Sequence, residues 1–598
     1  MFKSTTTFRQ NVSRFGRTLS RLLYGAGEQT AHDSLRRVTR ATLPTLPQLK
    51  LLPRTLSPLE RRVALSLVSL CLVSAGVLGA RWYLKHTTVV PKIGGEYTEG
   101  ILGFPLTTNP LLSQNGAELD LAALVTRGLF QHDASGTLVP DLAQDWSISS
   151  DQKTYLVSLK PSLQWSDGYP LTADDVVFTF QTLQNPALPG SRAKSFSDIV
   201  IKRQSSSSVS FTLRAPYAYF LESLRLGLLP AHVWQSLPLN SWLTAEANLQ
   251  PVGSGPWRFQ ALARDPNGNV KSYTLEPNPF THTAKPFLTK VILHFYPDAS
   301  SLGDALHQGL LDGVGGSGAQ EASGARKFAS YQLFLPQYSA LFYNERAGLL
   351  KVKAVRQGLS AALNRTELIN SVLEGQALPD YGPFPAGGRS LALATGGQAF
   401  DPAKAQELFA SAGFKREQAS EPYQNGPTTL ELTLTVADQG EPLQVAQMVK
   451  RQWEAVGVKV NLNLVPANRL VDEVVGQRNF QVLLSRELVG LSADPYPFWH
   501  SSQAAAPGLN LSGFQNREAD RLLSEARQSA DRELQLSNYR RFQAIVADEV
   551  PATFLYSSSY PYALNRALDG FTTKVIGQPA ERFTNLYQWY RVTARRWQ

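Results

Sequence analysis

Apolar positions recur along the chain with two different periods. Between residues 154 and 159 every second side chain is apolar, which predicts a half-buried strand. After an Asp167-Gly168 turn signal, Thr172 precedes two acidic residues and then the helix-spaced stripe Val176, Val177 and Phe180. A hydroxyl residue followed by negative charge is typical of a helix N terminus. The pattern therefore predicts a strand, a turn and a capped helix.

Strand-like and helix-like segments also follow one another in the second half of the chain, and their order indicates a parallel sheet. The residues 430–436 and 458–465 each have strand character, and 445–456 has a helical period and is followed by Gly457. Glycine directly after a helical segment is a common helix stop. Strand, helix and strand in this order favour an α/β lobe.

One apolar run differs from all others in length. Residues 63–80 contain 18 residues without a charge, about 27 Å of helix, near the thickness of a bilayer core. Arg61 and Arg62 precede it, and Trp82 and Tyr83 follow it as interfacial aromatics do. We interpret the run as an uncleaved signal anchor. A cleaved signal peptide is the alternative, but a 62-residue leader is long for one.

The charge of the chain is concentrated before this run. Of 58 Lys and Arg and 48 Asp and Glu, twelve basic and three acidic residues lie in 1–62, which leaves 46 and 45 elsewhere. The positive-inside rule places this tail in the cytoplasm and the large domain outside. The tail is expected to be disordered near anionic lipid, or to form a small helical contact for a partner. No helix-turn-helix pattern supports nucleic-acid binding.

Several motifs in chain order match one family. They are Leu-Val-Pro-Asp-Leu-Ala before Trp146, Trp-Ser-Asp-Gly from Trp165, Leu-Thr-Ala-Asp-Asp-Val-Val-Phe from Leu171, and Pro-Val-Gly-Ser-Gly-Pro-Trp-Arg-Phe from Pro251. The chain resembles the family 5 extracellular solute-binding proteins, the oligopeptide- and dipeptide-binding subunits of ABC importers. The resemblance covers roughly 95–598 and does not extend to 1–90.

The resemblance implies an α/β fold with two lobes, similar to type II periplasmic binding proteins, with the extra subdomain of peptide binders and here preceded by one transmembrane helix. The expected parts are a basic cytoplasmic tail (1–62), a transmembrane signal anchor (63–84), lobe I (91–130, 249–345 and 556–598), the extra subdomain of lobe I (131–248) and lobe II (346–555).

The resemblance also implies where a ligand binds. The expected ligand-binding residues are Glu99, Gly100, Ile101, Tyr343, Asn344, Asp494, Tyr496, Phe498 and Trp499. In peptide binders of the family an aspartate just upstream of the matching Asp-Pro holds the ligand's amino group, and here that place falls near Leu491. Either Asp494 takes this role or the ligand is not recognised by a free amino terminus. The three aromatic residues after it either stack on the ligand or belong to the core.

No enzyme signature is present. The sequence lacks His-Glu-x-x-His, a Gly-Lys-Ser/Thr phosphate loop, a cysteine cluster and a Gly-x-Ser-x-Gly elbow. Residues 313–318 fit Gly-x-Gly-x-x-Gly, but they follow a predicted helix end, so we interpret them as a flexible loop. We expect no catalytic residue, no metal site and no cofactor.

The function that the resemblance implies is a membrane-anchored, extracytoplasmic solute-binding protein of an ABC importer. It would capture peptides by hinge closure and hand them to ABC permease subunits. Two alternatives stay open: a sensor or scaffold that uses the fold without transport, and a binder of another solute such as a sugar or a nickel chelate.

Overall fold

The computed structural model describes residues 57–188, 196–322, 324–385, 399–418, 421–492 and 494–597. The chain forms two compact units, Met1–Val90 with Arg595–Gln598, and Pro91–Ala594. Nearly all of the predicted basic tail lies outside the described residues.

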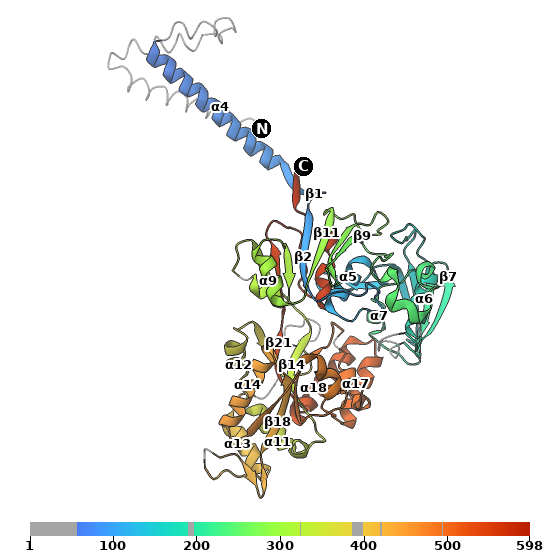
Figure 1. The fold of residues 1–598 in the computed structure, drawn as a ribbon, viewed down its shortest axis with the longest axis vertical. Helices are drawn as coiled ribbons and strands as arrows, with labels where there is room; N and C mark the ends of the chain where they lie inside the picture. Colours follow the sequence, from blue (N-terminus) through green and yellow to red (C-terminus); the bar gives the residue numbers. More distant parts are fainter. Residues whose placement is uncertain are drawn as a thin grey trace, which may run out of the picture. The chain divides into compact units, whose positions relative to one another are not determined.

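Lobe I is built on a mixed seven-stranded sheet (Figure 1). Its strands, in spatial order, are β13 (Phe328–Leu333), β22 (Tyr560–Asn565), β12 (Gly313–Gly315), β2 (Glu96–Leu102), β11 (Lys290–Tyr296), β10 (Val270–Pro277) and β9 (Trp257–Arg264). The central strand β2 runs parallel to both of its neighbours. The helix α5 (Gly116–Val125) contributes to the main core of this lobe, and α9 (Ala299–His307) belongs to a second cluster.

The segment predicted as a flexible loop, 313–318, is instead the buried strand β12 followed by the short helix α10 (Ser317–Glu321). A Cβ atom at Gly313 would collide with the side chains of Tyr97 and Glu99. The glycine is therefore explained by close packing inside the sheet.

Lobe II is built on a six-stranded sheet. Its strands, in spatial order, are β15 (Ala377–Pro379), β21 (Ala552–Ser558), β14 (Gln337–Tyr343), β20 (Val482–Leu488), β18 (Glu431–Ala437) and β19 (Lys459–Val465). The strands β18 and β19 are parallel and connected by α14 (Gly440–Ala455), which confirms the predicted strand–helix–strand unit.

Helices cover both faces of the lobe II sheet. One core cluster includes residues of α11 (Lys353–Ala361), α12 (Arg365–Val372), α13 (Pro402–Ser411) and α14, and the other includes residues of α16 (Tyr496–Trp499), α17 (Arg517–Gln528) and α18 (Arg532–Glu549). The sheet is thus buried on both sides, as is usual for parallel α/β strands.

The two sheets are joined where β13 leads into β14 and where β21 leads into β22. The two crossovers are tied to each other: the Gln337 amide donates to Ser558 Oγ at 3.0 Å, and the Ser559 hydroxyl donates to Gln332 at 2.6 Å. The boundary predicted at 345 is displaced, because β14 pairs along its length with β20 and β21 and so belongs to lobe II. The chain leaves lobe I at 334–336.

The extra subdomain contains an antiparallel four-stranded sheet. Its order is β5 (Ala143–Ile148), β6 (Thr154–Leu159), β8 (Ser208–Thr212) and β7 (Val200–Ser205). The predicted strand is β6, and the predicted helix is α6 (Ala173–Leu183), capped by Thr172 together with Asp175. Trp165 and Phe180 are fully buried in its own core. Both local predictions are confirmed.

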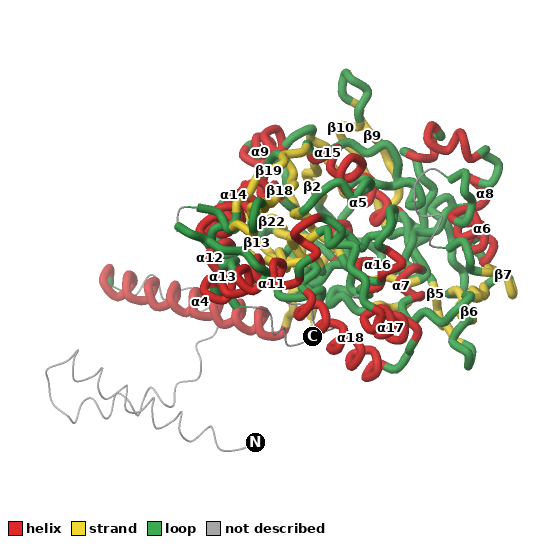
Figure 2. Tube along the Cα trace, turned by 90° about the horizontal axis from the view of Figure 1, so that it is seen from below, coloured by secondary structure: helices red, strands yellow, loops and turns green. Residues whose placement is uncertain are grey.

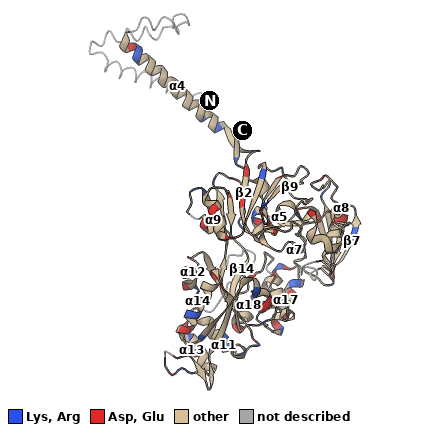
Figure 3. Cartoon of the chain, in the orientation of Figure 1, with Lys and Arg blue, Asp and Glu red and all other residues tan. Residues whose placement is uncertain are grey.

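The first unit contains α4 (Pro58–His86), a helix of 29 residues with no buried side chain. Ser57 and Glu60 form a capping box at its N terminus. Figure 3 shows its middle without Lys, Arg, Asp or Glu. Among the described residues it is the one helix long and apolar enough to cross a membrane. The strand β1 (Thr87–Lys92) follows directly and pairs with β23 (Val592–Trp597).

Candidate functional site

Lobe II touches the extra subdomain at Arg527, the second-last residue of α17. The Arg527 guanidinium lies between the rings of Tyr217 and Tyr496, 4.5 and 4.4 Å from their centroids. It is paired with Asp494 at 3.0 Å, and the Arg527 carbonyl accepts from the Ala218 N–H at 2.9 Å. We call these five residues the Arg527 contact. Figures 1 and 2 both place α17 beside α7 (Phe220–Ser223), which follows Ala218.

The Asp494 carboxylate has three partners within this contact. It accepts from the Tyr496 N–H at 3.1 Å and from the Tyr217 hydroxyl at 3.4 Å, besides its pair with Arg527. Burial raises the pKa of Asp494, and Arg527 opposes that rise. A second link lies nearby, where the hydroxyls of Tyr219 and Tyr539 are 2.9 Å apart. These contacts join lobe II to the extra subdomain, and we assign them a structural role and not one in proton transfer.

Three parts of the chain meet near Leu491. A Cβ atom placed on Gly136 of the extra subdomain would lie 3.2 Å from Leu491 Cδ1 and closer still to Val575. Gly136 has φ of 81°, a conformation that glycine adopts without strain. Leu491 therefore lies where lobe II approaches the other two parts, and the side chain at this position is apolar.

The aromatic residues after Asp494 separate into two groups. Phe498 and Trp499 are buried in the lobe II core, and Trp499 has no exposed surface. The sequence left open whether they stack on a ligand or belong to the core, and the structure places them in the core. Tyr496 is partly exposed and packs on Arg527. Asp494 and Tyr496 as ligand contacts stay predictions.

Tyr343 and Asn344 lie away from this region. Antiparallel pairing sets Tyr343 opposite Val482 and Gln337 opposite Leu488, so Tyr343 is at the other end of the strand pair from the segment holding Asp494. Tyr343 is buried with its hydroxyl on Thr553 at 2.7 Å, and Asn344 donates to the carbonyl of Phe480 at 2.9 Å. The structure does not bring this pair together with Asp494.

Glu99, Gly100 and Ile101 are buried residues of β2. The Glu99 carboxylate accepts from Arg582 Nε at 3.0 Å and from the Tyr562 hydroxyl at 3.1 Å, and it also contacts the Tyr97 hydroxyl. Burial raises the pKa of Glu99, against the opposing charge of Arg582. Glu99 is thus a buried partner of Arg582 in lobe I, and its predicted role toward a ligand stays untested.

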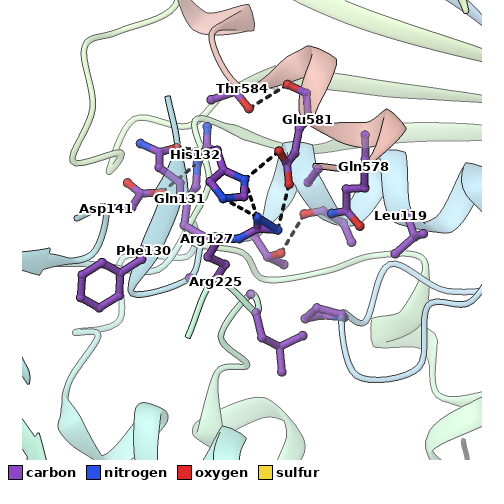
Figure 4. A pocket seen from close by; sticks show the side chains of 18 residues that line it. Leu119, Arg127, Phe130, Gln131, His132, Asp141, Arg225, Gln578, Glu581 and Thr584 are labelled. Carbon is purple, nitrogen blue, oxygen red and sulfur yellow. Dashed lines mark hydrogen bonds and ion pairs between the residues drawn. The ribbon is translucent and has the colours of Figure 1, made fainter. Parts of the chain in front are cut away.

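A cavity of about 140 Å³ lies where the extra subdomain meets lobe I (Figure 4). His132 reaches it from β3 (Phe130–His132) and is 3.0 Å from both Glu222 and Glu581, while Arg225 lies 2.8 Å from Glu581. Burial alone lowers the pKa of His132, but its hydrogen bonds to the two carboxylates outweigh burial and raise it. None of the lining residues comes from lobe II. The ion pairs connect the extra subdomain with lobe I.

Sequence reasoning missed Arg527 and Tyr217. They are far apart in the chain, and each is an ordinary residue type for its element, so no local pattern identifies either. Two Tyr in three residues before α7 are the one local signal, because paired aromatics are frequent at contact surfaces. Among the described residues no cluster of three or more His, Cys, Asp or Glu is arranged to hold a metal ion.

Glu487 leads to a pH prediction. It lies on β20 next to Tyr338 of β14, and burial raises its pKa to about 8 while Arg478 opposes the rise. The folded protein therefore binds more protons than the unfolded chain between roughly pH 4.5 and 8, so this residue lowers stability as pH rises through that window.

Glu487→Gln should abolish that dependence. We expect the variant to match the wild type near pH 4.5 and to be more stable by about 2–4 kcal/mol at pH 8. Calorimetric melting at several pH values measures this. Glu407→Gln, at an exposed carboxylate on α13, is the control and should leave the pH profile unchanged. Parallel profiles for Glu487→Gln and the wild type would contradict the shifted pKa.

Comparison with known proteins shows which family the chain is similar to. A profile described as bacterial extracellular solute-binding proteins, family 5 Middle, matches residues 137–508. The oligopeptide-binding protein AppA of Bacillus subtilis is 25% identical over 550 residues, covering 89% of this chain and 99% of AppA. The probable D,D-dipeptide-binding periplasmic protein DdpA of Escherichia coli is 25% identical over 449 residues, covering 72% and 81%.

Solved structures show the same fold. AppA from Bacillus subtilis in complex with a nonapeptide superposes with a TM-score of 0.69 at 24% identity, covering 84% of this chain and 99% of AppA. NikZ from Campylobacter jejuni in complex with Ni(L-His) gives 0.70 at 24% identity, covering 83% and 99%. The expected two-lobed α/β fold is confirmed.

Proposed function

Because the chain belongs to the family 5 bacterial extracellular solute-binding proteins, we propose that it captures peptides outside the cytoplasmic membrane for an ABC importer. The observation that supports this most directly is the Arg527 contact. Two sheets are joined at a pair of crossovers, and a separate cluster of side chains bridges lobe II and the extra subdomain. Such a molecule opens and closes about the crossovers, and a ligand that touches both lobes favours the closed form.

Peptides are favoured over other solutes by the relatives that cover most of the chain, several of which are named as peptide-binding proteins. Backbone hydrogen bonds from a peptide suit a site between sheets, since they give affinity with little sequence preference. Leu491 has no carboxylate, and the carboxylate of Asp494 is already paired with Arg527 and hydrogen-bonded by Tyr217. We therefore propose that recognition relies on the peptide backbone and on apolar side chains.

A thermal-shift screen tests the ligand class. Ligand at a hundred times its Kd should stabilise the protein by about 2.7 kcal/mol. We expect di- to hexapeptides to raise the melting temperature, including peptides with an acetylated amino terminus. Sugars and nickel chelates are the comparison sets. A shift with nickel–histidine alone would move the assignment to chelate binding, for which the likeness to NikZ is a reason.

We propose that α4 anchors the protein in the membrane, so that the solute-binding unit stays near its permease at high effective concentration. Deleting residues 1–90 should then leave a soluble, folded protein, because Pro91–Ala594 forms a compact unit by itself. Gel filtration and circular dichroism of the truncated chain measure this. Aggregation of a fragment beginning at Pro91 would contradict the boundary.

A sensor or scaffold without transport is the second candidate, suggested by the long basic tail. Affinity capture from membranes distinguishes the two. Recovery of ABC permease subunits with the full chain supports import. Tail-dependent recovery of other proteins, with no permease, supports the sensor.

A further inference from the structure

Three large aromatic side chains meet at the C-terminal end of α4. The ring of Trp597 lies 5.4 Å from the ring of Trp82 and 5.4 Å from that of Tyr83, edge-on to the latter. Trp597 and Trp82 are each more than half exposed, at 56% and 58%, and Tyr83 is 40% exposed. Packing joins these rings to one another but leaves much of their apolar surface uncovered.

The strand pair β1–β23 holds Trp597 in this place. Arg595 Nη1 donates to Thr87 Oγ1 at 3.1 Å, and its guanidinium lies 6.0 Å from the centre of the Tyr83 ring. The Thr87 hydroxyl in turn donates to the Tyr83 carbonyl at 2.6 Å. Hydrogen bonds, strand pairing and ring packing thus hold residues 595–597 beside the C-terminal end of α4.

The charged residues around these rings, in 81–92 and 592–597, are all basic. They are Arg81, Lys85, Lys92, Arg595 and Arg596, and neither 81–92 nor 592–597 contains Asp or Glu. The rest of the chain after residue 62 has nearly equal numbers of basic and acidic residues, so this concentration is unusual for the molecule. Aromatic rings with a polar edge next to Lys and Arg are typical of the membrane–water interface.

We propose that the Trp82–Tyr83–Trp597 cluster and its basic neighbours form a binding surface for phospholipid headgroups. The inference rests on the proposed membrane anchor. The uncharged run 63–80 occupies the hydrocarbon core, so Trp82 and Tyr83 lie two and three residues beyond it, at headgroup depth. Because Trp597 contacts both of these rings, it lies at the same depth.

Phosphate is the chemical group that this surface fits. Lys85 and Arg596 are exposed, and each adds a positive charge beside the aromatic rings. Lysine ammonium and arginine guanidinium both donate to phosphate oxygens, and the attraction is stronger for lipids with a net negative charge. The surface is continuous with the apolar span of α4, which makes the bilayer its occupant.

Headgroup quenching tests the depth of Trp597. The full chain is reconstituted into phosphatidylcholine vesicles that carry a nitroxide on the headgroup, and tryptophan fluorescence is compared between the wild type and Trp597→Phe. Phenylalanine keeps the packing on Trp82 and Tyr83. Since two of the tryptophans lie at the interface, the variant should lose about half of the headgroup quenching. Equal quenching of the two proteins would overturn the proposal.

Charge removal tests the phosphate assignment. Lys85→Gln with Arg596→Gln removes two positive charges and leaves the Arg595 contacts in place. The preference for labelled phosphatidylglycerol over labelled phosphatidylcholine should fall roughly thirtyfold, as expected for two basic residues at a membrane surface. Lys202→Gln with Arg214→Gln removes two exposed charges from the extra subdomain and should change nothing. An unchanged preference in the first variant would overturn the assignment.

Flotation with vesicles after an alkaline wash separates this proposal from the anchor. A chain that floats but shows no quenching by headgroup nitroxide retains the anchor and refutes the headgroup surface. A chain that does not float refutes the anchor and with it the surface. Quenching that depends on an added protein, and not on lipid composition, would assign the cluster to a protein partner and overturn the proposal.

Discussion

Replacing Arg582 with methionine should destabilise lobe I by about 3–5 kcal/mol, the largest effect that we expect from any single substitution here. The Arg582 side chain is 3% exposed and donates to Glu99 at 2.9 Å and to Asp120 at 2.7 Å. Methionine fills similar volume but leaves two buried carboxylates without a cation. A fall in melting temperature of roughly 10 °C by calorimetry is the expected result.

Acid should partly rescue that variant. Without Arg582, the raised pKa of Glu99 rises further, so the folded variant takes up protons that the unfolded chain does not. The deficit should therefore be smaller at pH 5 than at pH 8, and Glu99→Gln with Asp120→Asn in the same chain should remove much of it. Arg591→Met is the control. The Arg591 side chain pairs with Asp312 but is 31% exposed, so its loss should cost less than about 1 kcal/mol of stability. Equal losses in the two arginine variants would refute the argument.

Arg527→Ala should weaken ligand binding by roughly thirtyfold, corresponding to about 2 kcal/mol of closed-state stability. The substitution removes the pair with Asp494 and the contacts with the Tyr217 and Tyr496 rings, and it leaves the backbone bond to Ala218. A ligand that binds the closed form loses apparent affinity in proportion to the closed population. Calorimetry with a peptide from the thermal screen measures the change.

Arg521→Ala on the same helix is the matched control. Arg521 pairs with Glu518 and Glu525 of α17 and is 44% exposed, so its loss changes the charge equally without touching the extra subdomain. Small-angle scattering of the unliganded proteins gives a second readout. We expect a larger radius of gyration for Arg527→Ala alone. If both variants keep the wild-type radius and affinity, the Arg527 contact does not control closure.

Local structure was predictable wherever the signal was contained in a few neighbouring residues. The period-two run at 154–159 became β6, Thr172 became the cap of α6, and the spacing around 445–456 anticipated the parallel pair β18–β19. The reversal at 313–318 shows the limit of such signals. The segment was interpreted as a loop because it follows a predicted helix end, but Gly313 lies in a buried strand and packs closely beside Tyr97 and Glu99, which neighbours in the chain do not reveal.

The candidate site was predicted less well, because its residues are brought together by pairing across the chain. Asp494 as a ligand contact stays a prediction, and the structure shows that its carboxylate is paired with Arg527. Tyr343 was expected among the same ligand-binding residues, but the antiparallel register of β14 and β20 sets Tyr343 at the opposite end of this strand pair from the Asp494 segment.

The sequence by itself determined the family, the two-lobed fold and an apolar helix long enough to span a bilayer, since motifs, periodicity and run length are properties of contiguous residues. Tertiary structure alone decided which distant side chains contact one another. Arg582 with Glu99, Arg527 with Asp494, and Trp597 with Trp82 each join residues separated by tens to hundreds of positions. The free energy of such contacts depends on burial and distance, which are set only when the sheets and helices are packed.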